Sequence, residues 1–285
     1  MTYSHQNSEI RSFLSSTSIS VPAERKKVIK DDGLLVNSFE ELATKVAELA
    51  FYNPHHVLLF RGHASSNTNQ SSATDLKPSL FLPVKQRLSK NRLIQRMLAL
   101  KEAEVKFFNL YKEAGLANYQ ELGRSKFKRW ALLEHFGVCR TPLLEVSLSL
   151  RVAASVASIN NSSDSCIYVL GVPSLGGAMT VDQSGELHVV RLASVFPLTI
   201  ESHHSRDSYM LGQYTNISDF ETDQFALDFD SNFADRLISK FRFSPDLFWR
   251  NSGIENCRIL PSLIENQDIY KIASEVKNSL PKFED

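Results

Sequence analysis

The segment Trp130–Ser147 combines residue types that core packing does not require. His135 stands at the end of a helical pattern that breaks at Gly137. Arg140 lies in the turn that follows, and Glu145 lies in the apolar run beyond it. An imidazole near a carboxylate can move a proton or orient a substrate, and a guanidinium can bind an anion. We therefore take this segment as the predicted functional centre.

A second chemical candidate, Arg61, follows the apolar run 57–60. Apolar residues without alternation predict a strand buried on both faces, and we expect this strand to end at Arg61-Gly62. An Arg at the end of such a strand can hold a phosphate or a carboxylate through two hydrogen bonds. The alternative, an Arg that pairs with a structural acid, fits the spacing equally well.

Basic and aromatic residues alternate in the segment Gly123–Trp130, directly before His135. Such a pattern can hold a nucleic-acid backbone and its bases, whereas the alternative is the solvated start of a helix. The residues that we assign to nucleic-acid contact are Arg124, Lys126, Lys128, Arg129 and Trp130.

A third polar concentration covers residues 199–214. Adjacent side chains such as His203 and His204 diverge on a helix or a strand, so we predict no metal site there. Arg206 and Gln213 are the better candidates to line a site.

Composition limits the class of protein. A chain of 285 residues, 42% apolar and with 18 Phe, predicts one large domain with a substantial core. The zero net charge means that only a local basic patch could attract nucleic acid. Three scattered cysteines predict no disulfide framework or zinc site and favour a reducing, cytoplasmic location. We see no secretory signal and no apolar run of about 18 residues, so we expect no membrane span.

The pattern along the chain predicts an α+β fold in which helices flank a mixed β core. Residues 1–33 form a polar lead-in that we expect to be disordered, and residues 34–285 form the domain. The expected helices cover residues 38–53, 87–115, 148–158, 232–241, 245–253 and 268–280. Besides the run before Arg61, the expected strands cover 166–170 and 187–192, the latter after a hairpin tip at 182–186.

Motifs spread over residues 34–277 carry a family resemblance, in the order Phe60-Arg61-Gly62, Leu76–Leu80, Glu134–Ser147, Arg206 with Gln213, and Ile254–Val276. They are similar to the motifs of the FRG domain family. The chain departs from the family pattern at three places. Cys139-Arg140 stands in place of one Pro, Glu145 in place of Asp, and Val146 in place of an aromatic residue.

The order of the polar motifs also resembles that of ADP-ribosyltransferases, which implies a related fold. In those enzymes an Arg grips NAD, and a late acid steadies the ribose as nicotinamide leaves. The resemblance implies a catalytic set of Arg61, His135, Glu145 and Gln213, with Glu145 or Gln213 in the position of the acid. It implies an NAD-binding set of Arg61, Gly62, Ser79, Thr141 and Arg206, and no metal.

These resemblances imply a toxin-type effector of bacterial defence or toxin–antitoxin systems. It would transfer ADP-ribose from NAD to RNA or protein, and the basic segment before His135 favours RNA. An antitoxin or another regulatory protein would restrain it. The alternative is a non-enzymatic FRG interaction domain of a defence complex, in which Arg61, His135 and Glu145 form a buried polar network. A metal-dependent nuclease is the third hypothesis. It is disfavoured because the chain has too few clustered acids for a magnesium site.

Overall fold

The computed structural model describes residues 10–64, 75–82, 88–159, 164–182, 187–195, 207–213, 232–254 and 268–281. The chain divides into two compact units. The first unit comprises Met1–Leu76, Val146–Gly176 and Asn232–Ile259. The second comprises Lys77–Glu145, Gly177–Ser231 and Leu260–Asp285.

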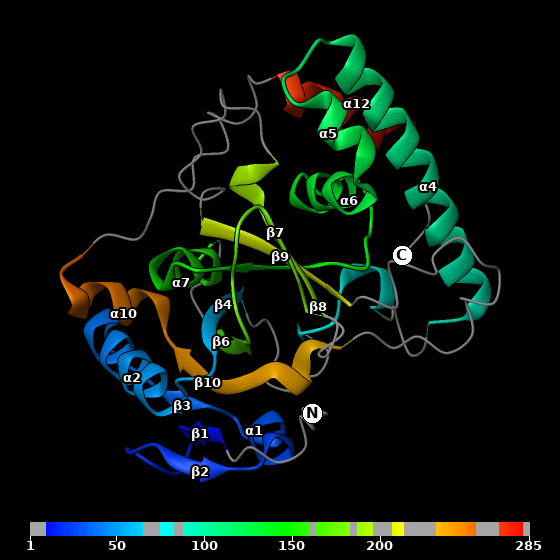
Figure 1. Ribbon diagram of the computed structural model, residues 1–285. Helices are drawn as coiled ribbons and strands as arrows, with labels where there is room; N and C mark the ends of the chain where they lie inside the picture. Colours follow the sequence, from blue (N-terminus) through cyan, green and yellow to red (C-terminus); the bar gives the residue numbers. More distant parts are fainter. Residues whose placement is uncertain are drawn as a thin grey trace. The chain divides into compact units, whose positions relative to one another are not determined.

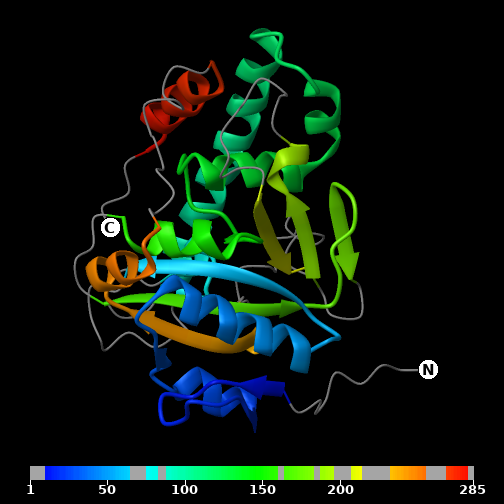
Figure 2. The same cartoon turned by 90° about the vertical axis from the view of Figure 1, so that its left-hand side faces the viewer.

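A mixed sheet forms the centre of the first unit (Figures 1 and 2). Its strands lie in the order β3 (Leu34–Leu35), β10 (Leu237–Phe243), β6 (Ser165–Val172), β4 (Val57–Ala64) and β5 (Leu144–Ser147), of which Val146 and Ser147 belong to this unit. The pair β3–β10 is parallel, and the other pairs are antiparallel. Together with the helices of both units, this sheet confirms the predicted α+β class.

Helix α2 (Phe39–Tyr52) illustrates how local sequence fixes an element of this unit. The Ser38 hydroxyl accepts a hydrogen bond from the Glu41 backbone N–H at 3.2 Å, which caps the first turn. The Glu41 carboxylate accepts in return from the backbone N–H of Asn37 at 2.8 Å. The helix ends before Asn53-Pro54, as predicted. Local sequence also fixes helix α10 (Pro245–Ser252). This helix starts with proline and ends at Gly253, which has a φ of 62°.

Helix α7 (Leu150–Ala157) packs on β4 at Gly62. A Cβ added to Gly62 would lie 1.9 Å from the carbonyl oxygen of Ala153. The small residues of α7, which the sequence marks as a close-packing helix, therefore meet a strand position that only glycine fits. The glycine of the Phe60-Arg61-Gly62 motif thus has a packing role.

The second unit is a helical layer with three antiparallel strands. Its helices are α4 (Lys90–Glu113), α5 (Tyr119–Arg124), α6 (Lys126–His135) and α12 (Asp268–Ser279). Its strands lie in the order β9 (Ser208–Gln213), β8 (Leu187–Arg191) and β7 (Met179–Asp182). The pairing of Asp182 with Leu187 fits the predicted hairpin, whose tip lies outside the described residues.

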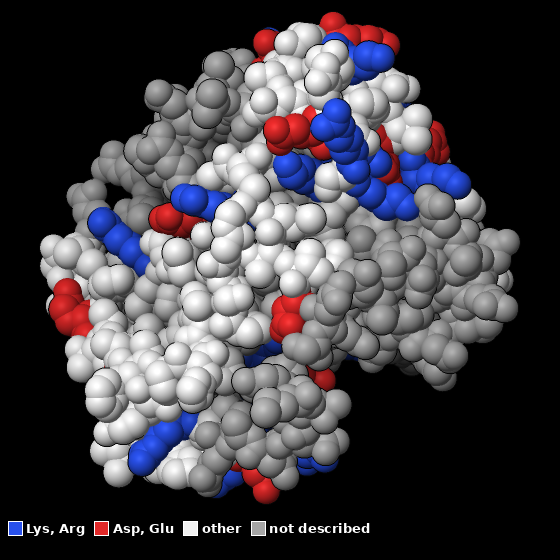
Figure 3. Space-filling view, viewed as in Figure 1, with Lys and Arg blue, Asp and Glu red and all other residues white. Residues whose placement is uncertain are grey.

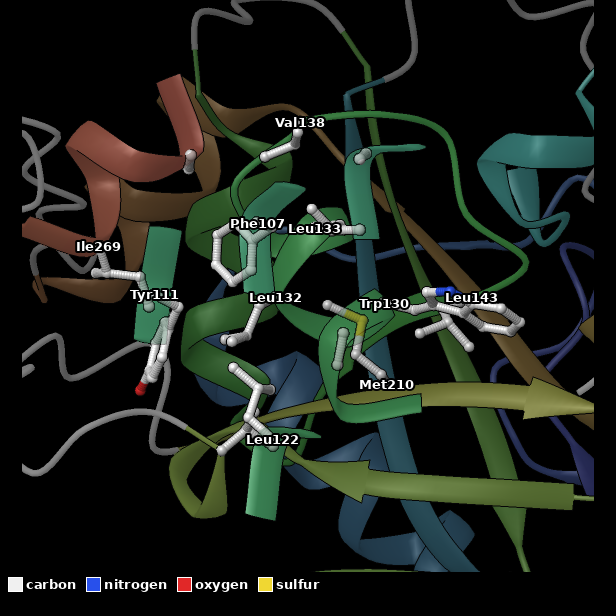
Figure 4. Close-up of a cluster of buried hydrophobic side chains, with 14 of the residues drawn as sticks. Phe107, Tyr111, Leu122, Trp130, Leu132, Leu133, Val138, Leu143, Met210 and Ile269 are labelled. Carbon is white, nitrogen blue, oxygen red and sulfur yellow. The ribbon is translucent and has the colours of Figure 1, made fainter. Parts of the chain in front are cut away.

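One hydrophobic cluster holds the second unit together (Figure 4). Phe107 and Tyr111 of α4 meet Leu132 and Leu133 of α6 within it, and Met210 of β9 joins the same cluster. The aromatic residues of α4 are therefore core, as their helical spacing predicts. This packing fixes α6, which carries His135.

The structure corrects three predictions about elements. Residues 10–33 are ordered: β1 (Ile10–Ser12) pairs with β2 (Val21–Ala23), and α1 (Arg25–Lys30) follows. Burial of Phe13, Leu14 and Val28 explains why this lead-in folds.

The other two corrections concern strands. The segment predicted as a helix over 232–241 forms a 3₁₀ turn, Phe233–Arg236, and then β10. All residues of β10 except Arg242 are buried, so both faces of this strand are covered and its sequence lacks the alternation of a half-exposed strand. Strand β4 does not end at Arg61-Gly62 but continues to Ala64. Within the described part of the chain, no helix is long and apolar enough to cross a membrane.

Candidate functional site

His135 occupies the last residue of α6. The helix starts where the Ser125 hydroxyl accepts from the backbone N–H of Lys128 at 3.3 Å. It ends where Gly137, with a φ of 57°, reverses the chain and donates to the Glu134 carbonyl at 2.9 Å. Glycine adopts this left-handed conformation without strain. The break predicted at Gly137 is confirmed, and it turns the chain toward Glu145.

The imidazole of His135 and the carboxylate of Glu145 form a close pair. Nδ1 of His135 lies 2.9 Å from Oε1 of Glu145. The His135 side chain is 15% exposed and that of Glu145 is 33% exposed. With Nδ1 directed at the carboxylate, Nε2 is the ring nitrogen that could exchange a proton with a substrate. The structure thus brings together two members of the predicted catalytic set.

Opposing influences act on the pKa of His135. Burial alone would lower this pKa, because it disfavours the imidazolium. The charge of Glu145, its hydrogen bond and the charge of Glu134 outweigh burial and raise the pKa above its ordinary value. The pair therefore favours a positively charged imidazole next to a negative carboxylate.

Glu134, the residue before His135, organises the neighbouring turn. Its Oε2 accepts hydrogen bonds from the hydroxyls of Ser79 at 2.9 Å and Thr141 at 2.7 Å. The backbone N–H of Thr141 donates to the Ser79 hydroxyl at 2.9 Å, and that of Leu80 donates to the Thr141 carbonyl at 3.0 Å. These bonds fasten the short 3₁₀ turn Ser79–Phe81 to the turn between His135 and Glu145. Ser79 and Thr141, predicted to contact NAD, thus have structural partners.

Arg61 lies within β4 of the first unit, opposite Tyr168 of β6. Its Nε donates to the backbone carbonyl of Asp75 at 3.0 Å. The Asp75 carboxylate accepts from the Tyr168 hydroxyl and lies 3.4 Å from Nε2 of His63. Burial first, then the charge and hydrogen bond of Asp75, raise the pKa of Tyr168, so that this phenol stays a donor. Arg61 therefore takes part in a polar cluster of its own unit.

The remaining members of the predicted sets are spread over the chain. Gln213 ends β9 in the second unit and lies opposite Leu187 of β8. Arg206, with the neighbouring His203 and His204, lies outside the described residues. Arg61 belongs to the first unit and the other predicted catalytic residues belong to the second, so the catalytic set as a whole stays a prediction.

Arg129 and Trp130, the last two residues of the basic and aromatic segment Gly123–Trp130, bond to an acid of the same unit. Trp130 is completely buried, and its indole N–H donates to Oε2 of Glu104 at 2.8 Å. Arg129 donates to Oε1 of the same carboxylate from Nε at 2.8 Å and from a terminal nitrogen at 2.6 Å. This corrects the expectation for Trp130, since a buried indole offers no face on which a base could stack.

The other residues of that segment differ in exposure, and Lys126 and Lys128 are partly buried. Arg124 is exposed, and Lys128 lies 3.2 Å from Glu121. The ammonium of Lys126 lies 5.7 Å from the centre of the Trp130 ring. Figure 3 shows Lys and Arg beside Asp and Glu on the side of α4 and α5. The basic charges are therefore interspersed with acids on this face.

Sequence reasoning missed the three acids that organise these clusters, Asp75, Glu104 and Glu134. Glu104 gave one usable signal, because it interrupts the apolar stripe of a long helix. An acid on a buried stripe needs a partner, and Arg129 with Trp130 supplies it.

Neither thiol nor metal chemistry is indicated among the described residues. They contain no group of three or more His, Cys, Asp or Glu side chains placed to hold a metal ion. Burial, followed by the charges of Glu134 and Glu104, raises the pKa of Cys139 to about 12. This thiol stays protonated near neutral pH and is a poor nucleophile.

Comparisons with protein-family models, with curated proteins and with solved structures find no match to this chain. The case for a function therefore depends on the residues and their geometry.

Proposed function

We propose that this chain transfers ADP-ribose from NAD to a macromolecular acceptor and that the His135–Glu145 pair is its chemical centre. The observation that carries the proposal is the 2.9 Å contact between the imidazole and a carboxylate that is itself one-third exposed. The motif resemblance to FRG domains and, in motif order, to ADP-ribosyltransferases supports the choice of reaction.

The reaction explains why these two residue types would be needed. The bond between the ribose C1 atom and the nicotinamide nitrogen breaks, and its electron pair leaves with nicotinamide. The ribose then carries positive charge, which a nearby carboxylate stabilises more strongly in the transition state than in the ground state. In the proposed mechanism Glu145 faces the ribose and its 2′-hydroxyl, and His135 fixes the direction of that carboxylate.

The raised pKa of His135 supports a second role for the imidazole. As an imidazolium it would attract the diphosphate of NAD, and after loss of a proton it would accept one from the attacking group of the acceptor. The new bond joins C1 to an oxygen or nitrogen of the acceptor. The proton displaced from that atom balances the reaction. Arg61 remains the proposed diphosphate ligand, and Gln213 the proposed polar neighbour of the ribose.

The acceptor is proposed to be RNA or protein, in the setting of a toxin-type effector restrained by a regulatory protein. Incubating the purified chain with NAD labelled in its adenylate half, and with RNA or protein in separate reactions, tests this. We expect label on one acceptor and free nicotinamide in equal amount. Absence of both label transfer and NAD binding would overturn the proposal.

A specific observation favours a second candidate, the non-enzymatic interaction domain. Arg61 bonds to the Asp75 carbonyl and Gly62 is needed for packing, so the motif residues of β4 have structural reasons to be present. The two candidates differ in what Glu145→Gln does. A transferase loses label transfer while staying folded, whereas an interaction domain has no such activity to lose.

A further inference from the structure

The face of the central sheet that lies opposite α7 is polar. A Cβ on Gly62 would meet α7, so its neighbours Arg61 and His63 point to the other face, because successive side chains of a strand alternate. Residues directly opposite one another on antiparallel strands share a face. Across β4, β6 and β10, this face therefore carries Arg61, Tyr168 and Lys240 in one row and His63, Cys166 and Arg242 in the next.

The electrostatic surroundings of Cys166 agree with this placement. Burial is the largest influence on the pKa of its thiol and raises it to about 11. The charges of Lys240, Asp75 and Arg242 also act on this pKa, so all three lie near the thiol. Because the thiol stays protonated near neutral pH, Cys166 adds no negative charge to the face.

Positive charge exceeds negative charge in these rows. Arg61, Lys240 and Arg242 are their cations. The acid that meets them is Asp75, and its carboxylate already accepts a hydrogen bond from the hydroxyl of Tyr168. One carboxylate therefore stands against three cations on this face.

Each of the three cations bonds to a backbone carbonyl. The donors and acceptors are Nε of Arg61 with Asp75 at 3.0 Å, Nζ of Lys240 with Asp31 at 2.5 Å, and Nε of Arg242 with Gly33 at 3.4 Å. A carbonyl accepts a hydrogen bond but does not neutralise a charge. Within the part of the chain that the structure describes, Lys240 and Arg242 form no ion pair.

Lys240 shows the missing negative charge most clearly. Its exposed fraction is 8%, and lysine is rarely so buried without a charged partner. Burial lowers the pKa of Lys240, and the surrounding groups that raise it do not offset this effect. An anion bound beside this ammonium would favour its charged form.

The second row is the part of the face that the solvent reaches. The side chain of His63 is 33% exposed, and Arg242 is partly exposed. Their strands lie on either side of β6, so their backbones are ~10 Å apart. Among the described residues, no acceptor bonds to the two terminal nitrogens of Arg242. These nitrogens form the planar fork that suits two oxygens of a phosphate.

We infer that this face binds a phosphate group of a small ligand, with Arg242 as the direct ligand and Lys240 as the buried counter-charge. Arg61 and His63 lie beside the same position. Under the proposed function the phosphate is the diphosphate of NAD, which Arg61 was already proposed to hold. Only that identity rests on the proposed function, whereas the phosphate site does not.

Calorimetric titration of the full chain with inorganic pyrophosphate, at an ionic strength held constant with sodium chloride, tests the site. We expect the wild type to bind and Arg242→Gln to bind at least about tenfold more weakly. Arg11→Gln is the matched control, because Arg11 of the same unit also donates to a backbone carbonyl, that of Ser20 at 2.9 Å. It should bind like the wild type. A wild type that binds no pyrophosphate would overturn the inference, and so would equal affinities of the two variants.

Lys240→Met tests the buried charge, because it removes the ammonium and keeps an unbranched side chain. Pyrophosphate should raise the Tm of the wild type, since it binds the folded state, and should not raise that of Lys240→Met. An equal rise in a folded Lys240→Met variant would refute the role of Lys240. If this variant does not fold, the partly exposed Arg242 still decides the case.

Glu145→Gln separates the phosphate site from the proposed transfer of ADP-ribose. This variant should bind pyrophosphate like the wild type while it loses label transfer. A chain that binds pyrophosphate but transfers no label would refute the transferase and support the site. A chain that transfers label but binds no pyrophosphate would refute the site alone.

Discussion

His135 ends helix α6, and Glu145 lies in the following strand. Nδ1 of His135 lies 2.9 Å from Oε1 of Glu145, and the turn between the two residues begins at Gly137. The hydrogen bonds of Glu134 to Ser79 and Thr141 hold that turn. A partly exposed carboxylate is thereby fixed by an imidazole, and against the effect of burial the carboxylate raises the pKa of that imidazole.

The pKa of His135 should depend on Glu145. In the wild type we expect it above the ordinary value of about 6.5. In Glu145→Gln it should fall, because the largest remaining influence is burial, which lowers it. NMR titration of the imidazole signals checks this, with His135→Asn used to assign the resonance. An unchanged pKa would show that the pair does not exist in solution.

The same pair should make stability depend on pH. Because the pKa of His135 is raised on folding, its contribution is full below about pH 6.5 and disappears as the pH rises through the folded-state pKa. The difference in unfolding free energy between wild type and Glu145→Gln should therefore be larger near pH 6 than near pH 9. Denaturant titrations at both pH values measure it. A difference that grows with pH has the wrong sign for this account.

The hydroxyl of Thr141 should matter for the turn. Thr141→Val keeps the shape of the side chain but removes the donor to Glu134 and the acceptor of the Leu143 backbone N–H. We expect Thr141→Val to lower the unfolding free energy by about 1–3 kcal/mol. Thr141→Ser keeps the hydroxyl and should retain most of the wild-type stability. Equal stability of the two variants would show that the hydroxyl has no structural role.

Gly62 should not tolerate even one extra methyl group. Gly62→Ala would place its Cβ 1.9 Å from the carbonyl oxygen of Ala153, so α7 or β4 must shift. We expect a loss of about 3 kcal/mol or more. Gly123→Ala is the control, because the three atoms nearest to its Cβ belong to the Phe108 ring, at 2.8 Å or more, and the end of a side chain shifts more easily than a backbone carbonyl. Denaturant unfolding should separate the two variants clearly.

The Glu104 cluster should behave as a buried ion pair and not as a nucleic-acid surface. Glu104→Ala leaves Arg129 without its carboxylate and should cost about 3–5 kcal/mol. Glu121→Ala removes only the exposed pair with Lys128 and should change stability by less than about 1 kcal/mol. Similar effects of the two substitutions in thermal or denaturant unfolding would contradict the assignment.

Local signals in the sequence were sufficient where a few neighbouring residues decide the structure. The caps at Ser38 and Gly253 and the break at Gly137 are of this kind. Contacts between distant residues were not predictable from such signals. β10 pairs with β3 and β6, which are distant in sequence, and Trp130 is buried in the hydrophobic cluster of the second unit, where Glu104 accepts its indole N–H. His135 and Glu145 are 10 residues apart in one segment, so the sequence already places them near each other. The partners of Arg61, Asp75 and Tyr168, lie further along the chain, and the sequence did not reveal them.

We propose that the His135–Glu145 pair transfers ADP-ribose from NAD. Label transfer from NAD is measured for wild type, Glu145→Gln and the matched control Glu121→Gln, each shown to be folded. We predict that Glu145→Gln lowers the rate about 100-fold or more and that Glu121→Gln leaves it unchanged. Full activity of a folded Glu145→Gln variant would contradict the account.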